Sequence, residues 1–131
     1  DGDYLYLHFE LAVDGWVSVG FNRTVGGMDG ANMILGYLDG ASPAYRNDAG
    51  RGRNHAEIES PAVDQFYFAV DGGTAIMEFS YPLAFPEGQG FSLEGLTPGE
   101  QYTLILAAHS SSQDIDRTHS SRGSANFTVE P

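Results

Sequence analysis

Strict alternation of apolar and polar side chains near the start of the chain constrains the fold most. Residues 4–12 read YLYLHFELA, and the two resulting faces are Leu5, Leu7, Phe9 and Leu11 against Tyr4, Tyr6, His8 and Glu10. A period of two over this length is typical of a β-strand with one buried face. No stretch longer than about two turns has helical spacing. The chain is therefore expected to build sheets rather than helices.

Other segments repeat this strand pattern at short intervals. We expect further strands over residues 16–21, 33–38, 65–70, 74–81, 101–108 and 125–129. Asp71-Gly72-Gly73 between two of them is the clearest hairpin turn in the sequence. Residues 42–61 and 109–123 are polar without periodicity, so the first is interpreted as a long surface excursion and the second as a serine-rich loop. About six to eight short strands predict an all-β fold, an antiparallel β-sandwich.

Length and composition fit one compact domain. The chain has 131 residues, and we expect residues 1–131 to form a single domain. Because the sequence begins almost inside a strand, we expect either a missing N-terminal strand or excision from a larger protein. The absence of cysteine excludes disulfides, thiolate metal sites, iron–sulfur clusters and covalent haem attachment.

The charge balance narrows the range of partners. There are 18 acidic residues and 6 basic ones, all arginine, for a net charge of -12. This balance argues against nucleic acid and anionic membranes as partners, and no apolar run is long enough to insert into a membrane. It permits a cationic partner protein, although a solubility surface for seawater or high salt is the favoured interpretation.

Sequence signals for catalysis and for simple metal sites are weak. There is no GxSxG motif, which a serine nucleophile of the hydrolase type would need. Acidic residues are so abundant that no pair of catalytic carboxylates stands out. Only Glu10 and Glu78 fall within predicted strands, and both are expected to face solvent. Asp114-Ile115-Asp116 lacks the rest of a calcium-binding loop. His109 and His119 occur without cysteine or an HExxH motif, which favours surface histidines over a zinc site.

Haem held by side chains alone is the remaining candidate. Such a site needs an apolar slot with an axial ligand on each side, and a thioether paired with an imidazole is a common set. Met28 lies in a glycine-rich loop and His119 in the serine-rich loop, whereas Met77 is mid-strand and Met33 starts an apolar run. Met28 and His119 therefore suit the two ligand positions, although structural packing explains them as well.

The order of several motifs resembles the DOMON family. The segments are GWVSVGFN (15–22), GGMDGANMILGYLDG (26–40), TAIMEFSYPL (74–83), YTLILAAH (102–109) and HSSRGSANFTV (119–129). The resemblance implies an immunoglobulin-like DOMON sandwich and a haem b cofactor. It places the axial ligands at Met28 and His119, with Met33 and His109 as fallback ligands.

The resemblance also implies a function. Trp16, Phe21 and Tyr37 would line the haem slot or pack in the core, and Arg122, with Arg117, would neutralise the haem propionates. The expected domain is an exported electron carrier (extracellular, periplasmic or cell-surface) rather than an enzyme, and its partner is a redox enzyme domain or a membrane cytochrome. Two alternatives stay open: a haem-free carbohydrate-binding module, with a pocket lined by Trp16 and tyrosines and Met28 packed inward, and a structural interaction domain.

Overall fold

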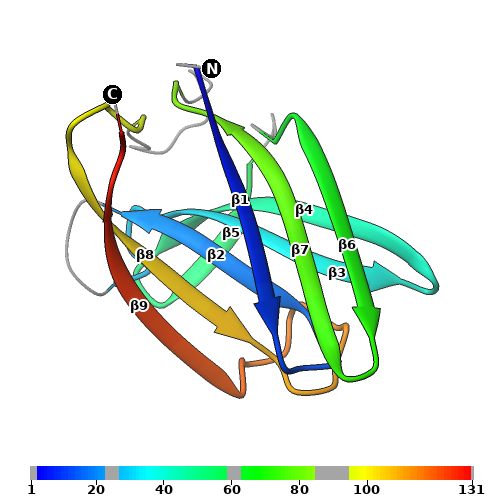
Figure 1. The fold of residues 1–131 in the computed structure, drawn as a ribbon. Coiled ribbons are helices and arrows are strands. Elements are labelled where there is room, and N and C mark those ends of the chain that lie inside the picture. Colours follow the sequence, from blue (N-terminus) through cyan, green and yellow to red (C-terminus); the bar gives the residue numbers. More distant parts are fainter. Residues whose placement is uncertain (1–2, 23–26, 59–62, 85–94, 131) are drawn as a thin grey trace.

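Two antiparallel sheets pack face to face in the computed structural model, which describes residues 3–22, 27–58, 63–84 and 95–130 (Figure 1). The first sheet has three strands in the order β1 (Tyr4–Leu11), β7 (Thr74–Pro82) and β6 (Gln65–Asp71). The second has six, in the order β5 (Asn54–Glu57), β4 (Ser42–Arg51), β3 (Asn32–Asp39), β2 (Val17–Asn22), β8 (Gln101–Ala108) and β9 (Ser121–Thr128). All described strand pairs are antiparallel. The predicted all-β sandwich is confirmed.

The core lies between the sheets and follows from the alternation in the sequence. Its most deeply buried side chains come from β2, β3, β6 and β7: Val17, Val19, Ile34, Phe68, Met77 and Tyr81. From β1, Leu5, Leu7, Phe9 and Leu11 pack against it, as the period of two predicts. Among the described residues, no helix is long and apolar enough to cross a membrane.

The hairpin predicted at Asp71-Gly72-Gly73 is confirmed. Asp71 pairs with Thr74, and the two glycines between them have φ angles of 56° and 84°. Turns that join twisted antiparallel strands need positive φ at both central positions, which glycine adopts without steric cost. The turn fixes the register of β6 against β7.

The expected surface excursion over residues 42–61 is wrong, because most of it forms strands β4 and β5. The apolar period is missing there because buried positions are polar: Asn47 and Asp48 are almost fully buried. Asn47 donates from its side-chain amide to the Asn32 side chain over 2.6 Å and to the Met33 carbonyl over 3.0 Å. Paired polar groups replace apolar ones, so periodicity cannot detect the strand. Residues 59–62 lie outside the described residues.

The last strand begins earlier than predicted. Strand β9 starts at Ser121 instead of residue 125, and six of its eight residues in a row are exposed. It pairs with β8 along one side only and forms an edge of the six-stranded sheet. An edge strand with small polar residues carries little apolar signal, which explains the shorter prediction.

Candidate functional site

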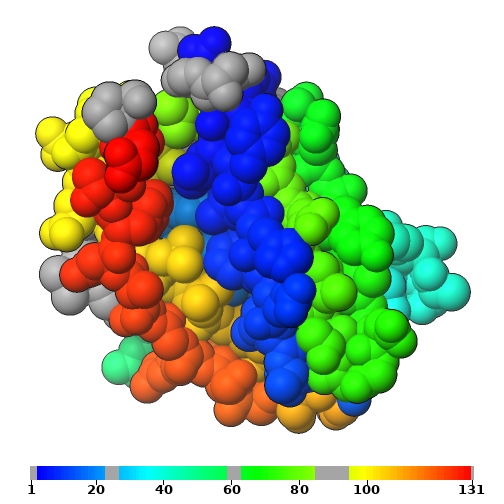
Figure 2. All heavy atoms as spheres, in the orientation of Figure 1, coloured from blue at the N-terminus to red at the C-terminus, as the bar shows by residue number. Residues whose placement is uncertain are grey.

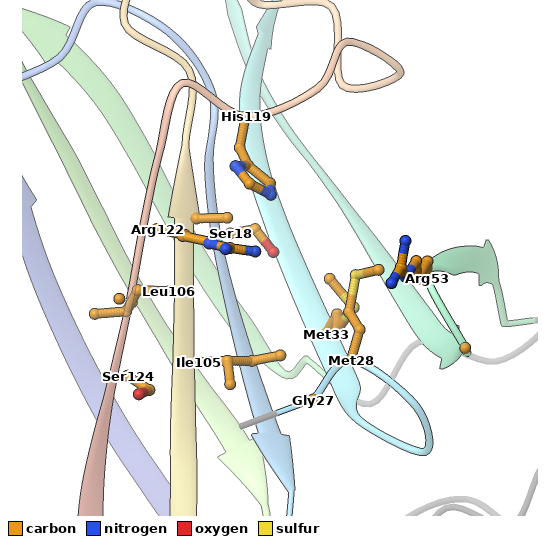
Figure 3. A pocket seen from close by; sticks show the side chains of 13 residues that line it. Ser18, Gly27, Met28, Met33, Arg53, Ile105, Leu106, His119, Arg122 and Ser124 are labelled. Carbon is orange, nitrogen blue, oxygen red and sulfur yellow. The ribbon is translucent and has the colours of Figure 1, made fainter. Parts of the chain in front are cut away.

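A cavity of about 870 Å³ opens on the outer face of the six-stranded sheet, the face that points away from the core (Figure 3). Its lining comes from four strands and three loops: Ser18, Gly27, Met28, Met33, Gly52, Arg53, Ile105, Leu106, Ala107, His119, Arg122, Gly123 and Ser124. The volume falls within the range of about 300–1,000 Å³ that is typical of ligand and cofactor sites.

The floor of the cavity is apolar because strand β3 carries apolar side chains on both of its faces. Ile34 points into the core between the sheets, whereas Met33 points outward with a small cluster that includes Ile105. Gly20 lies opposite both Met33 and Ile105 in the sheet. A Cβ there would lie 2.8 Å from Ile105 and 3.1 Å from Met33, so glycine is the residue that lets both side chains lie across the floor.

The loop that carries Met28 is fixed to strand β4 through Gly50. Gly50 donates to the Ala31 carbonyl over 2.8 Å and accepts from the Gly30 N–H over 3.0 Å, while Ala31 donates to the Met28 carbonyl over 3.0 Å. A Cβ on Gly50 would overlap the Met28 carbonyl. The close approach of the two backbones therefore requires glycine at position 50.

Two side chains, those of Asn22 and Asp29, hold residues 27–31 further. The Asn22 amide donates to the carbonyls of Gly27 and Asp29, over 3.0 and 2.9 Å. The Asp29 carboxylate accepts from the Gly52 N–H over 2.7 Å. The thioether of Met28 thus projects toward the cavity from a backbone with several fixed anchors (Figure 3).

His119 enters the cavity from the loop between β8 and β9. Its neighbour Ser120 donates its N–H to the Ala108 carbonyl over 2.9 Å and accepts at Oγ from the Ser110 N–H over 2.7 Å. In Figure 3 the half-buried imidazole points into the same space as the Met28 thioether, from the other end of the cavity. The structure therefore brings together the two residues expected to be ligands.

Two arginines line the cavity. Arg122, which the resemblance implied for the haem propionates, comes from β9, and Arg53 comes from the turn between β4 and β5 (Figure 3). Sequence reasoning missed Arg53 because its segment was interpreted as a surface excursion; a basic residue beside glycine in so acidic a chain was the available signal. Arg117 does not line the cavity, and its exposed side chain lies 3.7 Å from the Asp114 carboxylate.

The other expected site residues lie elsewhere. Phe21 belongs to the core between the sheets, where its ring centroid is 5.5 Å from that of Tyr81, so it is on the other face of β2. Trp16 is buried and bonded through its backbone to His109 and Ser112. Tyr37 is half-buried toward the far end of β3. None of Trp16, Phe21 and Tyr37 lines the cavity.

Of the two fallback ligands, Met33 lines the cavity and His109 does not. Met33 lines the cavity floor and contributes to an outer apolar cluster rather than to the core between the sheets. His109 does not line the cavity, and its Nδ1 accepts the N–H groups of Ser111 and Ser112 over 3.2 and 2.9 Å. This histidine stabilises the start of its loop.

A buried charged cluster, which sequence reasoning did not find, adjoins the floor. Asp48 pairs with Met33 across the sheet and is 0% exposed. Arg46 donates to both of its carboxylate oxygens over 2.7 Å, and His55 hydrogen-bonds to one of them. Burial alone would raise the pKa of Asp48, but the hydrogen bonds from His55 and Arg46 outweigh it and lower that pKa. The Asp48 carboxylate therefore stays ionised beside the cavity.

The donor set defines what the cavity can hold. An apolar floor, a thioether, an imidazole and two guanidinium groups suit a flat apolar molecule that carries carboxylates and a metal with affinity for sulfur and nitrogen. Among the described residues, no cluster of three histidine, aspartate or glutamate side chains is arranged to hold a bare metal ion.

Comparison with known proteins is informative about the fold. No family model and no curated protein matches the sequence. Among solved structures, the fold is similar to the cytochrome b domain of pyranose dehydrogenase from Coprinopsis cinerea, with a TM-score of 0.65 and 15% sequence identity. The superposition covers 96% of this chain and 68% of that chain. At this identity the likeness shows a shared fold.

Proposed function

We propose that residues 1–131 are a single haem b-binding electron-transfer domain in which Met28 and His119 are the axial ligands. One observation carries the proposal: a methionine and a histidine from separate loops, both expected from the sequence to be ligands, line the same cavity. The structural likeness to a cytochrome b domain supports it, because that protein has the same sandwich fold.

The residues of the cavity fit haem in three respects. Met33 and Ile105 give a flat apolar floor that depends on Gly20. Met28 and His119 enter the cavity from separate loops, so a metal held by a flat ring could bind both of them. Arg53 and Arg122 lie where guanidinium groups can hold carboxylates, which an acidic chain otherwise repels.

Each group then has a defined task. Bound haem supplies a metal centre that gains and loses one electron reversibly. Met28 and His119 would hold that centre and would leave no coordination position for a substrate, so the proposed domain would carry electrons rather than act as an enzyme. Arg53 and Arg122 orient the acidic edge, and Met33 with Ile105 excludes water from one face.

Such a carrier needs a redox partner. The similar cytochrome b domain belongs to a dehydrogenase, which favours a partner enzyme domain over a membrane cytochrome. The exported location that the sequence resemblance implies is also part of the proposal. Carbohydrate binding in this cavity has no support, because the described lining residues include neither Trp16 nor a tyrosine.

The test is a titration of the purified protein with haem b, followed by visible absorption. The wild-type protein is expected to give the sharp Soret and α bands of a six-coordinate low-spin site when reduced. Met28→Ala and His119→Ala are each expected to lose these bands, since each removes one ligand.

Matched controls use the other methionine and histidine of this region. Met33→Leu keeps the volume of the floor, and His109→Asn keeps a hydrogen-bond acceptor for the loop, so both are expected to retain the six-coordinate spectrum. A wild-type protein that refuses haem contradicts the function. A six-coordinate spectrum that survives in both ligand variants contradicts the ligand assignment.

A further inference from the structure

Two exposed tyrosines mark a second site on the outer face of the three-stranded sheet. Tyr6 on β1 is 63% exposed and Tyr67 on β6 is 50% exposed, the highest values for large hydrophobic side chains in the described part of the chain. Figure 2 looks onto this sheet, with β1, β7 and β6 at the front. One exposed aromatic ring is ordinary, whereas two on one sheet face indicate a binding surface.

The two rings border a groove along the central strand β7. The register pairs both Tyr6 and Gln65 with Ser80, and both His8 and Tyr67 with Glu78. Tyr6 and Tyr67 therefore lie on opposite sides of β7 and two residues out of step, which places their Cα atoms roughly 12 Å apart. The groove measures about 460 Å³, and its lining includes both tyrosines, Gln65, His8 and Glu78.

The groove is acidic. Nδ1 of His8 lies 2.7 Å from the Glu78 carboxylate, and Nε2 lies 3.1 Å from Glu10. One histidine faces two carboxylates, so the cluster keeps a negative charge even when His8 is protonated. Its surroundings add to this charge, because residues 3–14 and 63–84 contain six acids and no arginine: Asp3, Glu10, Asp14, Asp64, Asp71 and Glu78. All arginines of the chain lie in other segments.

From these observations we infer that the groove binds an arginine- or lysine-bearing segment of a partner protein. The faces of tyrosine rings attract cations, and arginine also stacks on them. The Glu78 carboxylate between the rings accepts hydrogen bonds from a guanidinium or ammonium group. Charge complementarity selects a basic segment, since neither an acidic ligand nor a nucleic acid suits this face.

This site is separate from the cavity. The cavity opens on the outer face of the other sheet, so the whole sandwich lies between the two sites. A basic segment bound here leaves the cavity accessible. The inference does not depend on whether the cavity holds haem.

The test measures binding of a fluorescent oligo-arginine peptide by polarisation at physiological ionic strength. Tyr67→Ala, Tyr6→Ala and Glu78→Gln are each expected to weaken binding about threefold or more. Tyr67→Phe keeps the ring face and is expected to bind like the wild type. Glu57→Gln, which removes one exposed charge from the six-stranded sheet, is expected to change binding less than Glu78→Gln.

Chemical-shift mapping of the wild-type protein gives a second measurement that needs no variant. The peptide is expected to perturb amides of β1, β6 and β7. Equal affinity for the wild type and both tyrosine-to-alanine variants would show attraction by net charge alone and overturn the inference. Tyrosine-dependent binding of a neutral oligosaccharide that displaces the peptide would overturn it in favour of a glycan site.

Discussion

Each sheet carries a histidine among charged partners on its outer face, and the two clusters differ mainly in burial. Asp48, with Arg46 and His55, lies on the six-stranded sheet and is 0% exposed. The cluster of His8 with Glu10 and Glu78 lies on the three-stranded sheet, and the side chain of His8 is 52% exposed. The groups are similar, but the Asp48 carboxylate is shielded from water, whereas His8 and both of its carboxylate partners are exposed.

This difference shows how the two outer faces are built. On the six-stranded sheet, Met28, Met33 and Ile105 form an apolar layer beyond the core, so a charge beside them must be fully paired. On the three-stranded sheet the outer face carries the exposed side chains of Tyr6, His8, Glu10, Tyr67 and Glu78, so its charges stay solvated and accessible to a partner. The outer face of the six-stranded sheet therefore resembles a protein interior, whereas that of the three-stranded sheet is an ordinary solvated surface.

The largest expected loss of stability comes from a substitution that breaks the buried cluster. Asp48→Asn leaves the Arg46 guanidinium without its carboxylate and is expected to cost about 3–5 kcal/mol in the free energy of unfolding, measured by urea denaturation. Glu57→Gln removes an exposed carboxylate from the position paired with Asp48 and is expected to stay within about 0.5 kcal/mol. Similar losses in both variants would contradict the difference in burial.

The same variant gives a pH dependence. Because the folded state lowers the pKa of Asp48 below its ordinary 3.8, the carboxylate stabilises the fold above that value and the contribution is lost as pH falls through the folded pKa. The stability gap between wild type and Asp48→Asn is therefore expected to be full at neutral pH and to close in acid below about pH 4. A gap that stays constant into strong acid would contradict this assignment.

The next largest effect is expected for two buried methionines, one between the sheets and one on the outer face of the six-stranded sheet. Met77 is fully buried between the sheets, and Met77→Ala is expected to cost about 2–5 kcal/mol because it leaves an enclosed void. Met33 borders a cavity that is already open, so Met33→Ala is expected to cost less. Thermal and urea unfolding of both variants checks the order, and the reverse order would show that the outer layer carries more of the stability.

A smaller effect concerns the Met28 loop. Gly50→Ala is expected to cost about 1–3 kcal/mol, because its Cβ would displace the Met28 carbonyl. Gly123→Ala is the matched control, since a Cβ there meets nothing within 4 Å on the cavity wall. Urea unfolding and the NMR signal of the Met28 methyl group measure both consequences; an unshifted methyl signal in Gly50→Ala would contradict the role of the close approach.

The smallest effect is on the exposed cluster. Hydrogen bonds to Glu78 and then to Glu10 raise the pKa of His8 above its ordinary 6.5. Its protonated form therefore contributes stability that is fully present below pH 6.5 and lost as pH rises through the folded pKa. Glu78→Gln is expected to lower the pKa of His8, as measured by NMR titration of the imidazole, with little change in unfolding. An unchanged pKa would contradict the pairing.

The sequence predicted those parts of the fold in which side-chain chemistry and position agree. The alternation of β1 and the glycine hairpin at Asp71 gave correct elements because each depends on local physics. Strand β4 was not predicted, because its residues Asn47 and Asp48 are polar although they are buried. Their burial depends on hydrogen-bond partners that are distant or out of pattern in the sequence. Long-range pairing of this kind leaves no local pattern.

The candidate site shows the same division. Met28 and His119 were expected as ligands, and the structure places both at one cavity, although ligation itself stays a prediction. Arg53 was missed, because its place in the cavity lining depends on the β4–β5 hairpin, and an arginine beside glycine is only a weak local signal for it. Phe21 was assigned to either a pocket or the core, and the face of β2 on which it lies places it in the core.

The anchoring of residues 27–31, which carry Met28, determines when their conformational entropy is lost. Because Asn22, Asp29 and Gly50 fix the backbone of these residues within the folded chain, their entropy is lost on folding and not on ligand entry. A ligand then meets a preformed wall, and more of its contact energy appears as affinity. Amide hydrogen exchange at Gly30 and Ala31 should therefore be slow before any ligand is added.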